Sequence, residues 1–335
     1  MASPRIVVAG AGSIGCFVGG VLSGARRNVT LLCRERIAAE LREHGLHLTD
    51  LDGMRLDVPA DRLNLATGPE VLAEADIVLV TTKSNATREM AALIARHSPG
   101  HAAVVSLQNG TGNAACLRDA LPGRTVLAGM VPFNVVALGA GRFHRGTSGA
   151  LAIEAGHPAI ATALRAPDLP IDEQPDMTAV QWGKLLLNLN NALNALSGLT
   201  LHRQLLDRRW RRVLAAQQDE ALALLDAAGI RPWSMGPLPA RLLPAVLRLP
   251  TPLFRLLARS AVRIDRTARS STWDDLQRGR HTEIDELQGA VVRLAAELGG
   301  VAPVNARVLA LVRQAERACQ GSPGLSPADV LPQAG

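Results

Sequence analysis

Lysine is almost absent from this chain of 335 residues, although arginine is abundant. Only two of its 36 Lys and Arg residues are lysines, Lys83 and Lys184. An arginine guanidinium stays charged at neutral pH, whereas burial can lower the pKa of a lysine ammonium enough for it to donate a proton. We therefore expect Lys184 to act as a general acid. The alternative is that both lysines are ordinary surface residues of an arginine-biased sequence.

A glycine pattern typical of dinucleotide sites follows the first apolar run, Arg5 to Ala9. Residues 10–15 read Gly-Ala-Gly-Ser-Ile-Gly. In such a strand–turn–helix unit the first glycine allows a tight turn, the second lets the backbone approach a pyrophosphate, and the third lets the helix pack on the strand. Amides at the helix N-terminus then bind phosphate oxygens. The expected cofactor contacts are Gly10, Gly12, Ser13, Ile14 and Gly15.

The second predicted strand, Asn28 to Cys33, ends where an NAD-specific enzyme carries an acidic residue for the ribose 2′-hydroxyl. This chain has Arg34 at that point. An arginine forms bidentate hydrogen bonds with a 2′-phosphate, so the sequence favours NADPH over NADH. Glu35 follows directly and weakens this preference. A solvated loop arginine is the alternative interpretation.

Apolar strands alternate with helical segments through the first half of the chain, which indicates an α/β fold with a Rossmann-type, doubly wound sheet. The predicted elements are strands at 75–81 and 102–107, helices at 85–97 and 113–120, and further strands, antiparallel at one edge, at 127–136 and 151–154. Ligands bind beyond the carboxyl ends of such strands. Lys83 lies there as a candidate for a phosphate or carboxylate, and Asn109 as a candidate for ribose, nicotinamide or substrate. Loop capping is the alternative role for Asn109.

Strand patterns nearly disappear after Met177, and helical periodicity takes over with breaks near 229–239 and 279. We predict an NADP-binding Rossmann domain at 1–174 and an all-helical substrate and catalytic domain at 175–330. Prolines and arginines exclude a membrane span in the apolar stretch 229–270. That stretch either shapes a substrate pocket, makes a dimer contact, lies on a membrane surface or simply packs as helices.

Composition argues against several classes of function. The four cysteines show no paired spacing and no neighbouring histidine cluster, so neither a metal site nor a disulfide framework is indicated. A net charge of +6 favours anionic ligands, but the arginines are scattered and aromatic residues are few, so nucleic-acid binding is not expected. The sequence has no export signal before its first strand, and we expect a cytoplasmic protein.

Chemistry-bearing side chains recur in the helical half. In its first long apolar helix, Lys184, Asn188 and Asn191 share one face. A polar stripe in a buried helix needs partners, and it is either a catalytic face or a polar network joining two domains. Ser271 and Glu283 follow in two polar clusters. Taken alone, Ser271 can be explained as an ordinary hydroxyl on a helix surface. Glu283 can be explained as an acidic residue that favours a helix N-terminus through the helix dipole.

Together these segments resemble the ketopantoate reductase family, also called 2-dehydropantoate 2-reductases, along nearly the whole chain. The matching motifs are residues 10–15, Arg34, Thr82-Lys83, Gln108-Asn109-Gly110, Trp182-Gly183-Lys184-Leu185 with Asn188, and Arg280-His281-Thr282-Glu283-Ile284-Asp285. The resemblance implies a helical second domain like the C-terminal domain of 6-phosphogluconate dehydrogenase. It also implies NADPH-dependent reduction of 2-dehydropantoate to pantoate, a step of pantothenate biosynthesis, and it admits a homodimer.

The resemblance also implies roles for individual residues. Lys184 is the general acid that protonates the keto oxygen, and Glu283 is its catalytic partner. Asn109 places the nicotinamide or the substrate. Asn188 holds a substrate hydroxyl, and Ser271 contacts the substrate carboxylate.

Two positions depart from the family pattern and bear on the substrate. A substrate-binding asparagine of well-known members corresponds to Ala192, and a later one aligns with His202. Asn191 shares the face of Lys184 and is a candidate to replace the first. Two alternatives therefore stay open, namely an NADP-dependent reductase of a different 2-keto acid or imine, and an NADPH-binding regulator without turnover.

Overall fold

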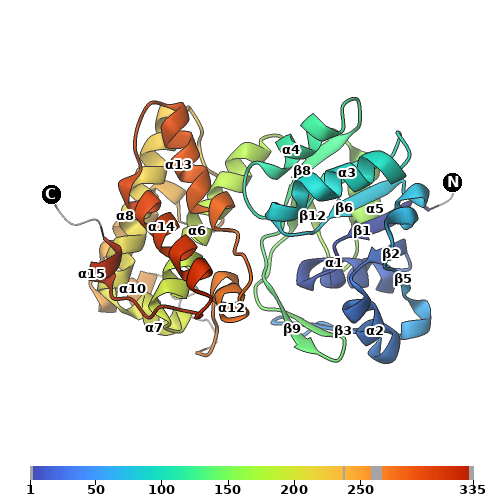
Figure 1. The fold of residues 1–335 in the computed structure, drawn as a ribbon, viewed down its shortest axis with the longest axis horizontal. Coiled ribbons are helices and arrows are strands. Elements are labelled where there is room, and N and C mark those ends of the chain that lie inside the picture. The colour runs from blue at the N-terminus through green and yellow to red at the C-terminus, as the bar shows by residue number, and fades with distance from the viewer. Residues whose placement is uncertain (1–2, 237, 258–265, 332–335) are drawn as a thin grey trace. The chain divides into compact units, whose positions relative to one another are not determined.

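The computed structural model describes residues 3–236, 238–257 and 266–331. The chain divides into two compact units, the first ending at Met177 and the second beginning at Thr178. An α/β sheet forms the first unit and helices form the second (Figure 1).

An eight-stranded sheet organises the first unit, in the strand order β12-β11-β8-β7-β6-β1-β2-β5. Its strands are β1 (Arg5–Ala9), β2 (Asn28–Leu32), β5 (Asn64–Ala66), β6 (Ile77–Val80), β7 (Ala103–Ser106), β8 (Val126–Met130), β11 (Leu151–Glu154) and β12 (Ile171–Gln174). The pairs from β5 to β8 are parallel, whereas β11 runs antiparallel to β8. The predicted doubly wound sheet with an antiparallel edge is confirmed.

Helices cover both faces of this sheet because successive side chains of a strand point to opposite faces. The helices are α1 (Ser13–Gly24), α2 (Glu35–His44), α3 (Thr87–His97), α4 (Asn113–Ala120) and α5 (Pro158–Leu164). Ile6 and Val8 of β1 lie in the core that contains α1 and α5. Val7 of the same strand lies in the core that contains α3 and α4. The strands are therefore apolar on both faces, as expected for a buried parallel sheet.

A second, four-stranded sheet in this unit was not predicted. Its order is β4-β3-β10-β9, with β3 (Leu46–Asp50), β4 (Arg55–Val58), β9 (Val135–Gly139) and β10 (Arg142–Arg145). The prediction of one strand over 127–136 is wrong, because β8 ends at Met130 and β9 belongs to the other sheet. Pro132 lies between them and lacks the N–H that a continuing strand would need.

The second unit contains helices and no strand among its described residues. They are α6 (Met177–Ser197), α7 (Leu201–Leu206), α8 (Arg208–Ala227), α9 (Leu243–Arg248), α10 (Thr251–Leu257), α12 (Ser271–Gln277), α13 (Gln288–Glu297), α14 (Pro303–Ala318) and α15 (Pro327–Val330). One apolar core joins α6, α8, α13 and α14. Within 3–236, 238–257 and 266–331, no helix is long and apolar enough to cross a membrane.

A buried arginine organises part of the proline-broken stretch 229–270. The Arg211 guanidinium on α8 donates hydrogen bonds to the carbonyls of Leu205 (2.9 Å), Leu247 (3.0 Å) and Leu249 (2.8 Å). It also lies 4.2 Å from the ring centroid of Phe254. Carbonyls at helix C-termini carry partial negative charge, which compensates the buried cation. These contacts attach residues 247–254 to α8. Residues 237 and 258–265 of the stretch lie outside the described residues.

Candidate active site

The glycine turn connects β1 to α1 at the carboxyl edge of the sheet. Gly10 has a φ of +93°, and a Cβ built on it would lie 2.9 Å from the backbone nitrogen of Thr82. A Cβ on Gly15 would lie 2.6 Å from Thr81 Oγ1. Both glycines are therefore required by the packing of the protein itself. This result agrees with the roles expected for the first and third glycines of the motif.

Gly12 differs from its two neighbours in the motif. A Cβ built on it would meet open space, with Gly10 O as its nearest neighbour at 4.0 Å. Gly12 is also the N-cap of α1, where it offers no side chain to bond the amides of the first turn. That turn, which begins with Ser13, Ile14 and Gly15, contains no acidic residue. These features fit the pyrophosphate of a dinucleotide, which needs close backbone approach and amide donors.

Replacing Gly12 with alanine is expected to weaken NADPH binding about tenfold or more without changing the stability of the fold. The added methyl group meets no protein atom but occupies the approach to the amides. A fluorescence titration with NADPH measures the affinity, and urea unfolding measures the stability. Gly100→Ala is a matched control, because its Cβ also meets open space. Unchanged NADPH affinity in Gly12→Ala would contradict the assignment.

Arg34 lies at the end of β2, where the sequence predicted a 2′-phosphate contact. It is exposed and forms the N-cap of α2. The neighbouring carboxylate of Glu35 accepts a hydrogen bond from Arg42 at 2.7 Å. Glu35 therefore has a cationic partner of its own, which reduces its expected competition for Arg34.

The connections after β6 and β7 carry Lys83 and Asn109. Asn113 Nδ2 and Ser84 Oγ donate hydrogen bonds to the carbonyl of Asn109, at 2.6 and 2.8 Å. Gln108 is buried and donates to the hydroxyl of Thr87, the first residue of α3, at 2.8 Å. Asn113 and Gln108 thus brace the two connections, and Asn109 presents an exposed side chain at the same sheet edge as the glycine turn. Sequence reasoning gave neither residue this bracing role.

Lys184 lies in the second turn of α6, and burial lowers the pKa of its ammonium to about 8. A lysine with such a pKa can exchange a proton near neutral pH. The preceding Gly183 is required by packing, because its Cβ would lie 2.1 Å from the carbonyl oxygen of Trp233. Trp233 N–H in turn donates to the carbonyl of Ala179 at 2.9 Å. The glycine before the lysine therefore lets the chain at Trp233 lie directly against α6.

The asparagines of α6 fall into two groups. Asn188 and Asn191 are half-buried, as is Lys184, and these are the residues predicted to share its face. Asn194, which sequence reasoning did not single out, is completely buried. Ala192, at the position where the family pattern has an asparagine, is buried in the apolar core.

Glu283 lies in a short loop that is attached to two helices. The preceding Thr282 donates to Glu316 on α14 from its backbone N–H (2.7 Å) and its hydroxyl (2.6 Å). Gln288, further along, donates to the carbonyl of Leu189 on α6 at 2.9 Å. The segment that carries Glu283 is therefore held between α14 and the helix of Lys184. Glu316 and Gln288 are supporting residues that no sequence pattern indicated.

Ser271 is the exposed first residue of α12, and Ser270 before it is buried. Ser270 Oγ donates to the carbonyl of Asn191 at 2.9 Å, which attaches this corner to α6 as well. The helical unit thus gathers the Ser271 and Glu283 segments around α6. No group of three or more His, Cys, Asp or Glu side chains that could hold a metal occurs among residues the structure describes.

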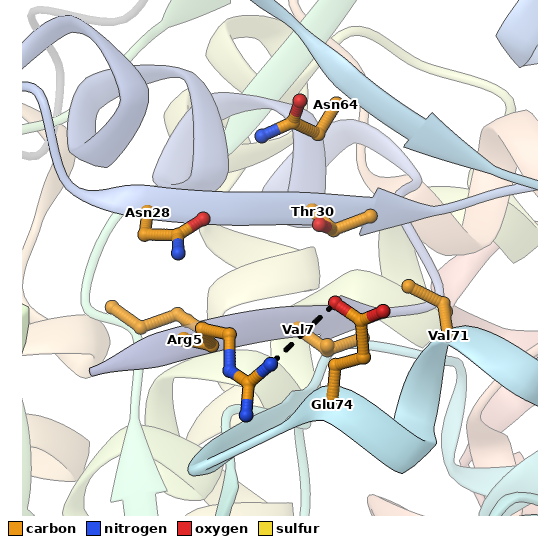
Figure 2. Close-up of a pocket in the computed structure, with 8 residues that line it drawn as sticks. Arg5, Val7, Asn28, Thr30, Asn64, Val71 and Glu74 are labelled. Atoms are coloured by element: carbon orange, nitrogen blue, oxygen red, sulfur yellow. Dashed lines mark ion pairs between the residues drawn. The ribbon is translucent and has the colours of Figure 1, made fainter. Parts of the chain in front are cut away.

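A surface pocket of about 280 Å³ lies elsewhere on the first unit. Figure 2 shows its lining of side chains from the amino halves of β1 and β2 and from β5, with an Arg5–Glu74 ion pair (3.7 Å) across it. It lies toward the amino ends of these strands, away from the glycine turn at their carboxyl ends. We therefore do not assign it to the dinucleotide.

Comparisons with known proteins identify the family. Residues 6–157 match the model for ketopantoate reductase PanE/ApbA, and residues 176–316 match the model for its C-terminal domain. The chain is 31% identical over 322 residues to a 2-dehydropantoate 2-reductase of Halobacterium salinarum, covering 93% of this chain and 99% of the relative. The chain belongs to the ketopantoate reductase family. It is thus an oxidoreductase of the 2-dehydropantoate 2-reductase type.

Solved structures agree with the family. A PanE/ApbA family ketopantoate reductase of Ralstonia eutropha JMP134 superposes with a TM-score of 0.80 at 29% identity, covering 94% of this chain and 99% of the other. A D-mandelate dehydrogenase, solved with NADH and anilino(oxo)acetate, has a TM-score of 0.77 at 20% identity, covering 94% and 99%. The second likeness shows the fold alone. The ketopantoate reductase fold is therefore found in proteins with different substrates and with NADH as a bound cofactor.

Proposed function

We propose that this protein reduces 2-dehydropantoate to pantoate with NADPH, within pantothenate biosynthesis and in the cytoplasm. The single observation that carries the proposal is Lys184, a lysine of lowered pKa in the family's Trp-Gly-Lys motif. The same chain has a glycine turn that is open at Gly12, where a dinucleotide pyrophosphate would lie. A homodimer is part of the prediction and is tested by the molar mass in solution.

Residues of the first unit bind and orient the cofactor. The pyrophosphate is bound by Gly10, Gly12, Ser13, Ile14 and Gly15. Arg34 binds the 2′-phosphate, Lys83 contacts a cofactor phosphate or the substrate carboxylate, and Asn109 orients the nicotinamide or the substrate. The chemistry supplied by bound NADPH is hydride transfer to the keto carbon.

Lys184 donates a proton to the keto oxygen as negative charge develops there. Burial favours the neutral amine and lowers the pKa of Lys184 to about 8, near the working pH. Glu283 is the catalytic partner of Lys184. Asn188 and Asn191 hold the substrate hydroxyl, and Ser271 binds its carboxylate.

The test of this function is NADPH oxidation in the presence of 2-dehydropantoate and a panel of other 2-keto acids, with NADH run in parallel. Efficient turnover of 2-dehydropantoate with NADPH is the expected result. NADPH binding without turnover of any 2-keto acid would instead indicate the non-catalytic regulator.

A different 2-keto acid is the second candidate substrate, and one observation favours it. The family's asparagine position is occupied by Ala192, which is buried in the apolar core and has no side-chain group that could hydrogen-bond a substrate. A substrate that needs no hydrogen bond from this position would lose nothing from the replacement. The candidate is supported if an aromatic or branched 2-keto acid has a higher kcat/KM than 2-dehydropantoate.

Replacing Arg34 with glutamine is expected to weaken NADPH binding about tenfold and to leave NADH binding nearly unchanged, because only NADPH carries the 2′-phosphate. Dissociation constants for the two cofactors measure the effect. Arg36→Gln is the matched control, since Arg36 is equally exposed and already lies 3.7 Å from Glu40. A parallel loss for both cofactors in Arg34→Gln would contradict a specific phosphate contact.

The rate of ketone reduction is expected to fall as the pH rises through about 8, the pKa of Lys184. Reduction requires the protonated ammonium, whose fraction falls above that pKa. The reverse oxidation requires the neutral amine and is expected to rise over the same range. The test is to measure kcat against pH for ketone reduction and for the reverse oxidation. If both rates rose, or both fell, as the pH passed through about 8, the assignment of Lys184 as the acid would be contradicted.

A further inference from the structure

Asn194 is a buried polar side chain of α6 with three hydrogen bonds. It lies roughly three turns after Lys184 on the same helix, and it is 0% exposed. Its Nδ2 donates to the carbonyl of Leu199 (2.9 Å) and to Gln204 Oε1 (3.2 Å), and its Oδ1 accepts from the backbone N–H of Ser270 (2.9 Å). Both donor hydrogens and the acceptor oxygen are thus used.

Two backbone groups determine the orientation of the Asn194 amide, namely the Leu199 carbonyl that accepts from Nδ2 and the Ser270 N–H that donates to Oδ1, and Gln204 agrees with it. Gln204, which is also buried, donates from Nε2 to Asn190 Oδ1 at 2.8 Å. Its oxygen therefore faces Asn194 and accepts from Nδ2. This arrangement directs Asn194 Oδ1 to Ser270, because a reversed amide would place two N–H groups against each other. Hydrogen bonds are therefore donated in one order, from the N–H of Ser270 to Asn194, from Asn194 to Gln204 and from Gln204 to Asn190. This chain starts at the residue next to Ser271.

A second bond attaches the same corner to α6. Ser270 Oγ donates to the carbonyl of Asn191 and accepts from the N–H of Trp273, at 2.9 and 3.2 Å. Ser270 is therefore held at both its backbone and its side chain. Ser271, the next residue, is exposed and begins α12. Because α6 also carries Lys184, these bonds attach the start of α12 to the helix of Lys184.

We propose that Asn194 is a positioning residue that sets the separation between Lys184 and Ser271, and thereby the preference for 2-keto acids over uncharged ketones. The inference rests on the proposed function, in which Lys184 contacts the keto oxygen and Ser271 the carboxylate. In a 2-keto acid these two groups are on adjacent carbons, so their two partners must keep one separation. A displaced Ser271 loses the carboxylate, while the keto group can still reach Lys184.

The test compares Asn194→Ala with Asn190→Ala. Both remove one amide from α6 and one bond to Gln204, but only the first also removes a hydrogen bond to Ser270. The measured quantity is kcat/KM for the 2-keto acid divided by kcat/KM for its methyl ester. In Asn194→Ala we expect this ratio to fall about tenfold, mainly through a higher KM for the acid. In Asn190→Ala we expect it to stay within about twofold of the wild-type ratio.

Two further variants separate positioning from general damage. Ser271→Ala alone and together with Asn194→Ala is expected to give the same ratio, because Asn194 acts only through Ser271. If Asn194→Ala does not fold, Asn194→Leu, which removes the acceptor of the Ser270 N–H but fills a similar volume, provides the same comparison. The proposal would be overturned if Asn194→Ala lowered kcat/KM equally for the acid and the ester, which would leave the ratio at the wild-type value.

The failure of this inference is distinguishable from the failure of the proposed function. If the wild-type protein does not reduce 2-dehydropantoate but reduces another 2-keto acid, the ratio is measured with that acid and its ester. If it reduces no 2-keto acid, both the function and the inference are overturned. If the wild-type protein is active and Asn194→Ala keeps its ratio, only the inference fails.

Discussion

Lys184→Ala is expected to lower kcat for ketone reduction by about 10²- to 10⁴-fold, the usual contribution of a general acid. The residual turnover should no longer depend on the pKa near 8 that burial gives Lys184. The dissociation constant for NADPH should stay at the wild-type value, because Lys184 lies on α6 in the helical unit and the glycine turn lies in the other unit. Steady-state kinetics and a fluorescence titration measure the two quantities.

Lys184→Arg is the informative companion variant. It keeps a positive charge at the position but cannot release a proton near neutral pH. If Lys184 acts as an acid, the arginine variant should be nearly as slow as the alanine variant. If Lys184 only supplies a charge that binds substrate, the arginine variant should retain most of kcat. Wild-type turnover in Lys184→Ala would show that another group protonates the substrate.

Asp50→Asn is expected to destabilise the first unit by about 3–5 kcal/mol, the usual cost of removing one partner of a buried ion pair. Asp50 ends β3 and Arg145 ends β10, and the two strands pair in parallel with these residues opposite each other. The Arg145 and Asp50 side chains are only 9% and 3% exposed. The Arg145 guanidinium also lies 5.4 Å from the ring centroids of both Phe17 and Phe133.

The pKa of Asp50 is consistent with this interpretation. Burial alone would raise it, but the hydrogen bond from Arg145 and those from the N–H groups of Met54 and Asp52 outweigh burial and hold the pKa below its usual value. Stability from this group is therefore present above the pKa of an unfolded aspartate and is lost as the pH falls through the lowered pKa.

Urea unfolding of three variants tests the buried pair. Glu35→Gln breaks the exposed Glu35–Arg42 pair (2.7 Å) and should cost less than about 1 kcal/mol. Adding Arg145→Met to Asp50→Asn should recover part of the loss, because no unpaired charge then remains in the core. A loss for Asp50→Asn no larger than that for Glu35→Gln would contradict a structural role for the buried pair.

Local sequence patterns were sufficient to predict most of the Rossmann-type sheet. The turn at 10–15 and the strands around Val7, Val78 and Val105 are local features, since glycine spacing and continuous apolar runs depend on neighbouring residues alone. The same patterns did not reveal the four-stranded sheet. Its central pair joins residues near 48 and 143, and the short strands that form it become recognisable only once they pair.

The sequence by itself determined which residue types are available for chemistry, namely a rare lysine, a glycine turn and a helix rich in asparagine. Only the tertiary structure decided which of these side chains are structural. Helical spacing places Asn188, Asn190, Asn191 and Asn194 on one helix, but burial depends on what packs against each. Asn194 meets the backbone of Ser270, which is distant in sequence, and becomes a buried support. Asn188 stays half-buried beside Lys184, because chain segments far apart in sequence determine the surroundings of each asparagine.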